Sequence, residues 1–196
     1  MDLEGAKRYI LDRLDHDLPR DLSYHSPQHT RDVAAAALRI GASEGLTADE
    51  MALLETAAYY HDSGFIYQYA DHEERGCQVA REVLPGFGFD SDQIERVCET
   101  IMATKIPQSP KSHMAQVLCD ADLDYLGSEQ FYPVGGSLFT ELMVKGILAD
   151  EKAWNRMQVR FLENHSYFTE TAIRERNPFK LEYLSQVKAI VAGYED

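Results

Sequence analysis

An all-helical single domain is the fold that the sequence predicts. Apolar residues recur at intervals of three and four almost throughout the chain, and convincing alternation of apolar and polar residues, as expected of strands, is absent. The 196 residues suit one domain with a sizeable core, and no stretch is long or polar enough to be a domain linker. Hydrophobic residues form 44% and charged residues 27% of the chain, which is ordinary globular usage and argues against disorder.

Capping and breaking residues divide this pattern into successive helices. Ser26 followed by Pro27 predicts a helix start, because Ser caps a helix and Pro is tolerated at its first position. Thr47 and Glu50 have the spacing of a capping box, in which each side chain accepts from the backbone N–H of the other. We expect helices over about 2–16, 27–43, 47–61, 71–84, 91–104, 112–126, 137–148, 150–163, 168–176 and 179–193, with a loop over 65–70.

Charge and cysteine usage exclude several classes of protein. The chain holds 33 acidic and 19 basic residues, a net charge of −14. Nucleic acids and anionic membranes require a basic face, so we expect neither as a partner through bulk charge. No secretory signal or membrane span is evident, which predicts a cytoplasmic protein. The three cysteines lack CxxC spacing, so we expect buried thiols and no disulfide frame or cysteine zinc site.

Ligand-type side chains interrupt the apolar pattern at three places. His29 lies early in the second expected helix, His61 and Asp62 end the largely apolar third one, and three aspartates fall within 120–124. A charge buried at the end of an apolar helix must be paired or bind a metal. A His-Asp pair alone also arises by chance, as at residues 16–17 in a polar setting, so the ordered set of three places is the informative feature.

This ordered set resembles the HD-domain superfamily of metal-dependent phosphohydrolases, which is defined by H…HD…D ligands on a helical core. The likeness is to its small bacterial members, and it covers residues 24–127 by motif and the rest of the chain more loosely. It implies an all-α HD-domain helical bundle over 1–196, with C-terminal helices over about 137–193.

The resemblance also implies a ligand set. His29, His61, Asp62 and one aspartate of 120–124 would bind the metal. The last ligand of the superfamily typically sits in an Ala-Asp pair, which favours Asp122, whereas Asp120 and Asp124 would be its neighbours or surface charges. Two imidazoles with two carboxylates suit Mn²⁺, Fe²⁺, Co²⁺, Ni²⁺ or Zn²⁺ better than Ca²⁺ or Mg²⁺.

Binuclear relatives carry further histidines after the HD pair. His72 lies near the place of the first of these, but Thr104 and Lys105 stand where a later His-His pair would be. The departure favours one divalent transition metal and argues against the di-iron oxygenases of this fold.

Five further residues have a functional and a structural interpretation. His72 is a candidate general acid or a neighbour of a helix start, and Lys105 a candidate phosphate ligand or a solvated lysine at a helix end. His25 would border the cavity or be structural. Arg176 and Lys180 would bind phosphate or lie on a solvated helix face.

The resemblance implies a phosphohydrolase that acts on a small phosphorylated substrate, with a nucleotide as one candidate, by metal-activated water. A different class is a catalytically silent metal-containing module that binds a ligand or signals. A third is a structural protein in which His61 and Asp62 bond to each other without metal.

The spacing of Trp154, Phe161, Tyr167 and Phe168 predicts core or dimer contacts over base stacking, and a homodimer is compatible with the sequence.

Overall fold

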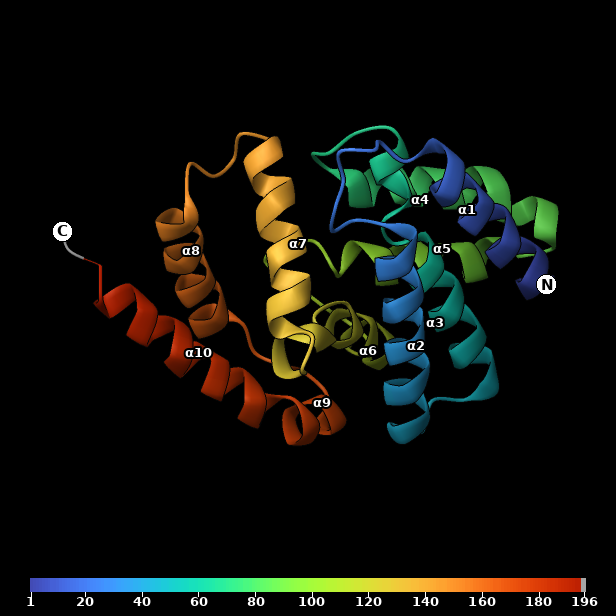
Figure 1. Ribbon diagram of the computed structural model, residues 1–196. Helices are drawn as coiled ribbons and strands as arrows, with labels where there is room; N and C mark the ends of the chain where they lie inside the picture. The colour runs from blue at the N-terminus through green and yellow to red at the C-terminus, as the bar shows by residue number, and fades with distance from the viewer. Residues whose placement is uncertain (195–196) are drawn as a thin grey trace.

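The protein is built almost entirely from helices (Figure 1). The computed structural model describes residues 1–194, which contain no strand, so the helical class is confirmed. No helix within these residues has the length and apolar character needed to span a membrane. The α-helices are α1 (Leu3–Asp17), α2 (Pro27–Ser43), α3 (Ala48–Tyr60), α4 (His72–Val83), α5 (Ser91–Met102), α6 (His113–Asp122), α7 (Phe131–Val144), α8 (Glu151–Asn164), α9 (Glu170–Glu175) and α10 (Asn177–Ala192). Short 3₁₀ helices are η1 (Ser63–Ile66), η2 (Leu84–Phe87) and η3 (Asp124–Gly127).

The two helix starts that the capping residues predict are present. The Ser26 hydroxyl accepts a hydrogen bond from the backbone N–H of His29 at 3.2 Å, which fixes the first turn of α2. Thr47 and Glu50 form the reciprocal capping box at the start of α3.

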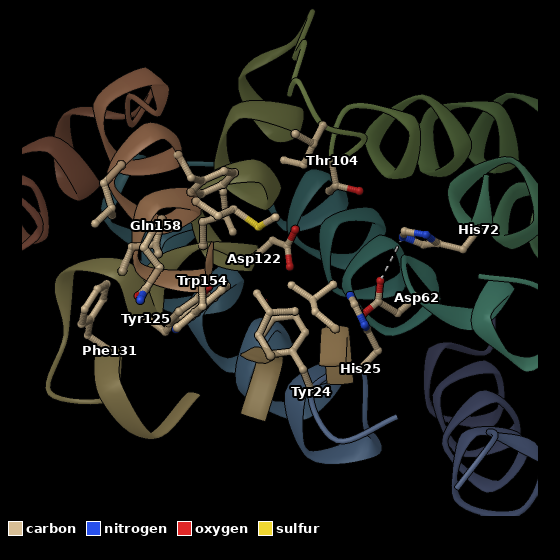
Figure 2. A pocket seen from close by; sticks show the side chains of 18 of the residues that line it. Tyr24, His25, Asp62, His72, Thr104, Asp122, Tyr125, Phe131, Trp154 and Gln158 are labelled. Atoms are coloured by element: carbon tan, nitrogen blue, oxygen red, sulfur yellow. Dashed lines mark ion pairs between the residues drawn. The ribbon is translucent and has the colours of Figure 1, made fainter. Parts of the chain in front are cut away.

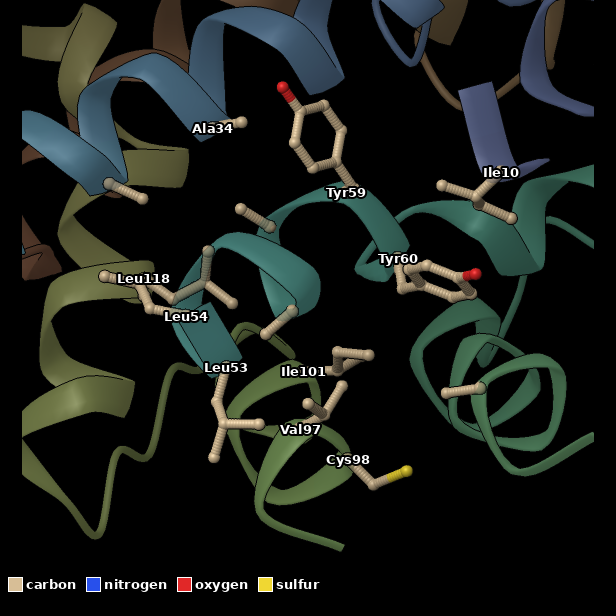
Figure 3. Packing of buried hydrophobic residues seen from close by; sticks show 14 of the residues in the cluster. Ile10, Ala34, Leu53, Leu54, Tyr59, Tyr60, Val97, Cys98, Ile101 and Leu118 are labelled. Atoms are coloured by element: carbon tan, nitrogen blue, oxygen red, sulfur yellow. The ribbon is translucent and has the colours of Figure 1, made fainter. Parts of the chain in front are cut away.

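The central helix α3 is surrounded by the other helices of the larger core (Figure 3). Its residues from Leu53 to Tyr60 are buried except Glu55, and α1, α2, α5 and α6 contact it. A helix that is apolar all round must be buried. The Tyr60 hydroxyl, also buried, donates to the carbonyl oxygen of Ala6 at 3.1 Å. The end of α3 therefore delivers the next residues, His61 and Asp62, into the interior.

The C-terminal helices form a second apolar cluster. Helices α8 and α10 pack together, and α10 also contacts η3. Figure 1 shows α7 between this pair and α2. The Phe131 ring of α7 stacks on Tyr183 of α10 with centroids 4.5 Å apart, and Glu141 of α7 binds the segment ahead of α2. Helix α7 thus joins the two parts of the molecule.

Two helices differ from their expected bounds by four residues or more. The helix expected near 137–148 is α7, which begins at Phe131 and ends at Val144. Pro133 does not delay the start, because the N–H groups of a first turn have no partner within the helix. The helix expected over 112–126 ends at Asp122, and a 3₁₀ turn follows.

A prediction concerns the close approach of η1 to α4. A Cβ added at Gly64 would overlap the backbone carbonyl of His72, whereas one added at Gly86 of η2 would meet no atom within 4 Å. We expect Gly64→Ala to lower the free energy of unfolding by about 1 to 3 kcal/mol, as overpacking does. The matched Gly86→Ala should change it by less than about 0.5 kcal/mol. Urea unfolding of both variants measures this, and equal losses would contradict the packing interpretation.

Candidate metal centre

Three helices bring the predicted ligands together. His29 lies in the first turn of α2, His61 and Asp62 follow the last residue of α3, and Asp122 is the last residue of α6. Helix α2 packs on both α3 and α6. Side chains that lie up to 93 positions apart in the sequence therefore meet, because these helices share one core.

The side chains converge on a common point. His29 Nε2 lies 3.2 Å from Asp122 Oδ1 and 3.4 Å from Asp62 Oδ2, and His61 Nε2 lies 3.2 Å from Asp62 Oδ2. Ligand atoms of His29, His61 and Asp122 all lie within 4.8 Å of one another. Both Nε2 atoms and Asp62 Oδ2 are buried without a hydrogen-bond partner. Unpaired buried ligand atoms of this kind fit a divalent cation.

The backbone fixes which nitrogen of His61 faces this point. Its Nδ1 lies 2.7 Å from the carbonyl oxygen of Ala58, one turn earlier on α3. A carbonyl oxygen only accepts, so Nδ1 carries the proton and donates it. Nε2 is then left with its lone pair directed into the centre, as a metal ligand requires.

The charges of the four side chains depend on one another. Burial alone would raise the pKa of Asp62 and Asp122, but the imidazoles of His61 and His29 hold both values well below the usual range. Burial alone would lower the pKa of His61, yet the two carboxylates raise it well above its ordinary value. The centre therefore stabilises positive charge next to the carboxylates, and a cation would replace the imidazole proton.

The aspartates of 120–124 point in three directions. Asp122 alone faces His29 and His61. Asp120 is fully buried and accepts hydrogen bonds from the backbone N–H groups of Phe168 and Thr169, and burial raises the pKa of its carboxyl. Asp124 lies beyond α6 and pairs with guanidinium groups. Asp120 thus fastens the segment before α9 to α6.

A cavity of about 200 Å³ borders the centre through Asp62 and Asp122. Figure 2 shows His25, Asp62 and His72 at one end of it and aromatic side chains at the other. A metal ion at the centre would therefore be reachable by a small molecule, as catalysis requires of an open site.

Two histidines at the cavity flank one phenyl ring. The Phe65 ring stacks on His25 and on His72, with centroids 3.9 Å apart in both pairs. His72 Nε2 lies 3.6 Å from Asp62 Oδ1, and its Nδ1 lies 3.3 Å from the carbonyl oxygen of Tyr69. The stack holds both imidazoles against the cavity wall beside the centre.

Glu141 of α7 holds His25 in place. Its fully buried carboxylate lies 2.5 Å from His25 Nδ1 and accepts from the backbone N–H groups of Tyr24 and His25 and from the Tyr69 hydroxyl. Burial alone would raise the pKa of Glu141, but His25 and these donors lower it. His25 is left with Nε2 to offer to a ligand.

The remaining predicted residues lie away from the cavity lining. The Lys105 ammonium pairs with Asp71 at 2.7 Å and with Glu74 at 2.5 Å. Arg176 forms a two-pronged pair with Asp124 at 2.8 and 3.0 Å.

Lys180 is buried and is also distant from the lining. It donates to the carbonyl oxygen of His165, and burial lowers its pKa. Burial and this ammonium lower the pKa of His165 to about 4.

Sequence reasoning missed several residues that line the cavity or hold a lining residue in place. Glu141 stands alone as an acid in the apolar run 138–144, which was a usable signal of a buried charge. Glu73 is buried and lines the cavity next to His72. It was missed because an acidic residue in the first turn of a helix is common and does not indicate a site. Trp154 and Phe161 line the cavity as well, a position that their helical spacing did not indicate.

Comparison with known proteins agrees with this centre. Residues 28–124 match the family model of the HD domain, a stretch that includes all four predicted ligands. The protein belongs to the HD-domain family. HD domains bind divalent metals and characterise a superfamily of metal-dependent hydrolases, so this is the general class of the chain. A comparison with curated proteins gave no match.

Solved structures share the fold over nearly the whole chain. A predicted HD superfamily hydrolase from an uncultured Thermotogales bacterium is 24% identical, with a TM-score of 0.62 over 93% of this chain and 91% of its own. Bacillus subtilis YpgQ in complex with ADP is 24% identical, with a TM-score of 0.64 over 98% of both chains. A Lactobacillus plantarum protein is 18% identical, with a TM-score of 0.68 over 99% of this chain and 100% of its own.

The ligand set predicts a metal content. We expect about one equivalent of a divalent transition metal per chain in protein purified without chelator, measured by inductively coupled plasma mass spectrometry. His61→Ala should reduce it to under about a tenth, because it removes a buried donor. His16→Ala, in the exposed pair at residues 16–17, is the matched control and should keep the metal. Equal metal content in both variants would contradict the assignment.

A second prediction concerns Glu141 and pH. A carboxyl whose folded pKa is lowered contributes stability above its unfolded pKa of about 4.3 and loses it as pH falls through the folded value. Glu141→Gln should therefore lower the free energy of unfolding by about 1 to 3 kcal/mol at pH 7 and by less at pH 3.5. Urea unfolding at both pH values tests this, with exposed Glu129→Gln as control. A loss that does not shrink in acid would exclude the carboxylate charge as the cause.

Proposed function

We propose that the protein hydrolyses a phosphate ester of a small molecule, with one divalent transition metal held by His29, His61, Asp62 and Asp122. The observation that carries the proposal is the set of buried, unpartnered ligand atoms beside an open cavity. A bound ion would lower the pKa of a water molecule and polarise a phosphoryl oxygen. A silent binding module would equally hold the metal, but the cavity beside it favours a reaction there.

The histidines of the cavity have separate proposed roles. His72 Nδ1 donates to the carbonyl oxygen of Tyr69, so Nε2 is the atom that exchanges a proton with the cavity. We assign it the protonation of the leaving oxygen, as a general acid. His25, whose Nδ1 is held by Glu141, would donate from Nε2 to a phosphoryl oxygen in its imidazolium form, in which both ring nitrogens carry hydrogen. Both side chains are positioned before substrate arrives, so little reorganisation accompanies the reaction.

The other predicted substrate contacts have weaker support. Lys105, Arg176 and Lys180 each have protein partners and lie outside the cavity lining. Their roles in binding phosphate stay predictions. The ADP in the YpgQ structure is the support for a nucleotide as substrate, and the lining of the cavity decides between a nucleotide and other phosphate esters.

The proposed function is tested by comparing two phosphate esters whose leaving groups differ in how much they need protonation by a general acid. Metal-loaded protein should release phosphate from phenyl phosphate and p-nitrophenyl phosphate, and Asp62→Ala should abolish both activities. His72→Ala should lower kcat for phenyl phosphate about 100-fold or more. It should lower kcat for p-nitrophenyl phosphate far less, because p-nitrophenolate leaves without a proton.

The variant Lys105→Ala, compared with His72→Ala, shows which of the two predicted catalytic residues contributes to the reaction. Because its ammonium is neutralised by Asp71 and Glu74, we expect kcat to fall less than about threefold for both esters. Metal-loaded protein that hydrolyses no phosphate monoester or diester would contradict the proposed function and favour the silent module.

A further inference from the structure

The cavity extends from the metal centre into an apolar chamber. We use this name for the part lined by Leu126, Phe131, Leu138, Trp154, Met157 and Phe161, which lies between η3, α7 and α8. Figure 2 shows Trp154 and Phe131 across the cavity from Asp62 and His72. One end of the cavity is therefore polar and the other apolar.

No lysine or arginine lines this cavity within the part of the chain that the structure describes. The ionisable lining groups are the carboxyls of Asp62, Glu73 and Asp122, two histidines and Tyr24 and Tyr125. Lys105 lies between the lining residues Thr104 and Ile106, but its ammonium points to Asp71 and Glu74 instead.

The lining of the chamber offers few polar atoms, and some of them have partners in the protein. The Gln158 amide donates to Asn155 Oδ1 at 3.1 Å. Burial raises the pKa of Tyr125, whose hydroxyl is bonded to that of Tyr24. A polar or charged ligand group entering the chamber would lose its water and gain little in return.

Aromatic contacts keep the chamber open. Phe131 stacks on Tyr183, and Trp154 stacks on Phe139 with centroids 5.9 Å apart. These contacts favour the orientations in which the two rings line the chamber. An apolar cavity costs stability unless something occupies it, so its presence beside a reactive centre indicates a binding role.

We propose that the substrate is a phosphate monoester of an apolar, uncharged alcohol, an alkyl or aryl phosphate, whose carbon skeleton occupies the apolar chamber. This rests on the proposed function, since the phosphate would lie at the Asp62 and Asp122 end. A nucleoside triphosphate or a polyol phosphate would put charge or hydroxyl groups where the protein offers no lysine or arginine and few hydrogen-bonding groups.

A series of n-alkyl phosphates from ethyl to octyl tests the proposal, because the leaving alcohols share their chemistry and differ only in length. With metal-loaded protein, kcat/KM should rise about fourfold for each methylene until the chamber is full. Glycerol 3-phosphate, ADP and dATP should be poorer than octyl phosphate. A flat series, or a preference for dATP or ADP, would overturn the proposal and leave the phosphohydrolase function intact.

Two matched variants test whether the chamber is responsible. Met157→Lys puts a cation into the chamber, and Met143→Lys makes the same change on α7 outside the lining. We expect Met157→Lys to remove the rise with chain length and Met143→Lys to retain it. The same dependence in both variants would place the alkyl chain elsewhere and contradict the proposal.

A binding measurement separates this inference from the proposed function. Trp154 is the only tryptophan of the chain and lines the chamber, so its fluorescence reports occupancy without turnover. Octylphosphonate should shift the emission and bind at least about tenfold more tightly than ethylphosphonate. Binding with this preference but without hydrolysis of any ester would support the chamber while refuting the phosphohydrolase. Equal affinities would refute the chamber.

Discussion

The burial of ligand atoms without hydrogen-bond partners is the constraint on which the rest of the structure depends. His29 Nε2, His61 Nε2 and Asp62 Oδ2 are enclosed by the core and face one another. Water cannot compensate for their desolvation, so a proton or a cation must. Because the second half of α3 is buried except at Glu55, its end lies inside the fold, and α2 and α6 must pack against it to complete the set. Folding of this half and binding of an ion are thereby thermodynamically linked.

The C-terminal helices are attached to this half by two buried carboxylates. Asp120 of α6 binds the backbone of Phe168 and Thr169, and Glu141 of α7 binds the backbone ahead of α2 together with His25. Each carboxylate accepts several hydrogen bonds, which lowers the cost of its burial. The contacts of Glu141 also orient the imidazole of His25, which lines the cavity. Structural attachment and preparation of the site are therefore one set of interactions.

Helical periodicity is a local signal, and it predicted the helical class. The ligand set of His29, His61, Asp62 and Asp122 came instead from a resemblance in the order of these residues, and the structure places His29, His61 and Asp122 close together. The start of α7 was wrong, since Pro133 reads as a break although a first turn tolerates it. The partner of His25 could not be predicted, because Glu141 is 116 residues away and reaches it only through tertiary packing. The distinct surroundings of the three aspartates in 120–124 likewise come from neighbours on other helices.

The cavity is built from two parts of the chain. One part holds the proposed metal ligands, and the other lines the chamber proposed to select the substrate. All four predicted ligands lie within the 28–124 segment that matches the HD domain, whereas most of the apolar chamber comes from residues 126–161, beyond it. The metal centre depends on close distances between buried atoms, so few substitutions preserve it. The chamber depends only on volume and apolar character, which many side chains supply. Changes on α7 and α8 can therefore alter which alcohol is accepted while the helices that hold the ligands stay the same.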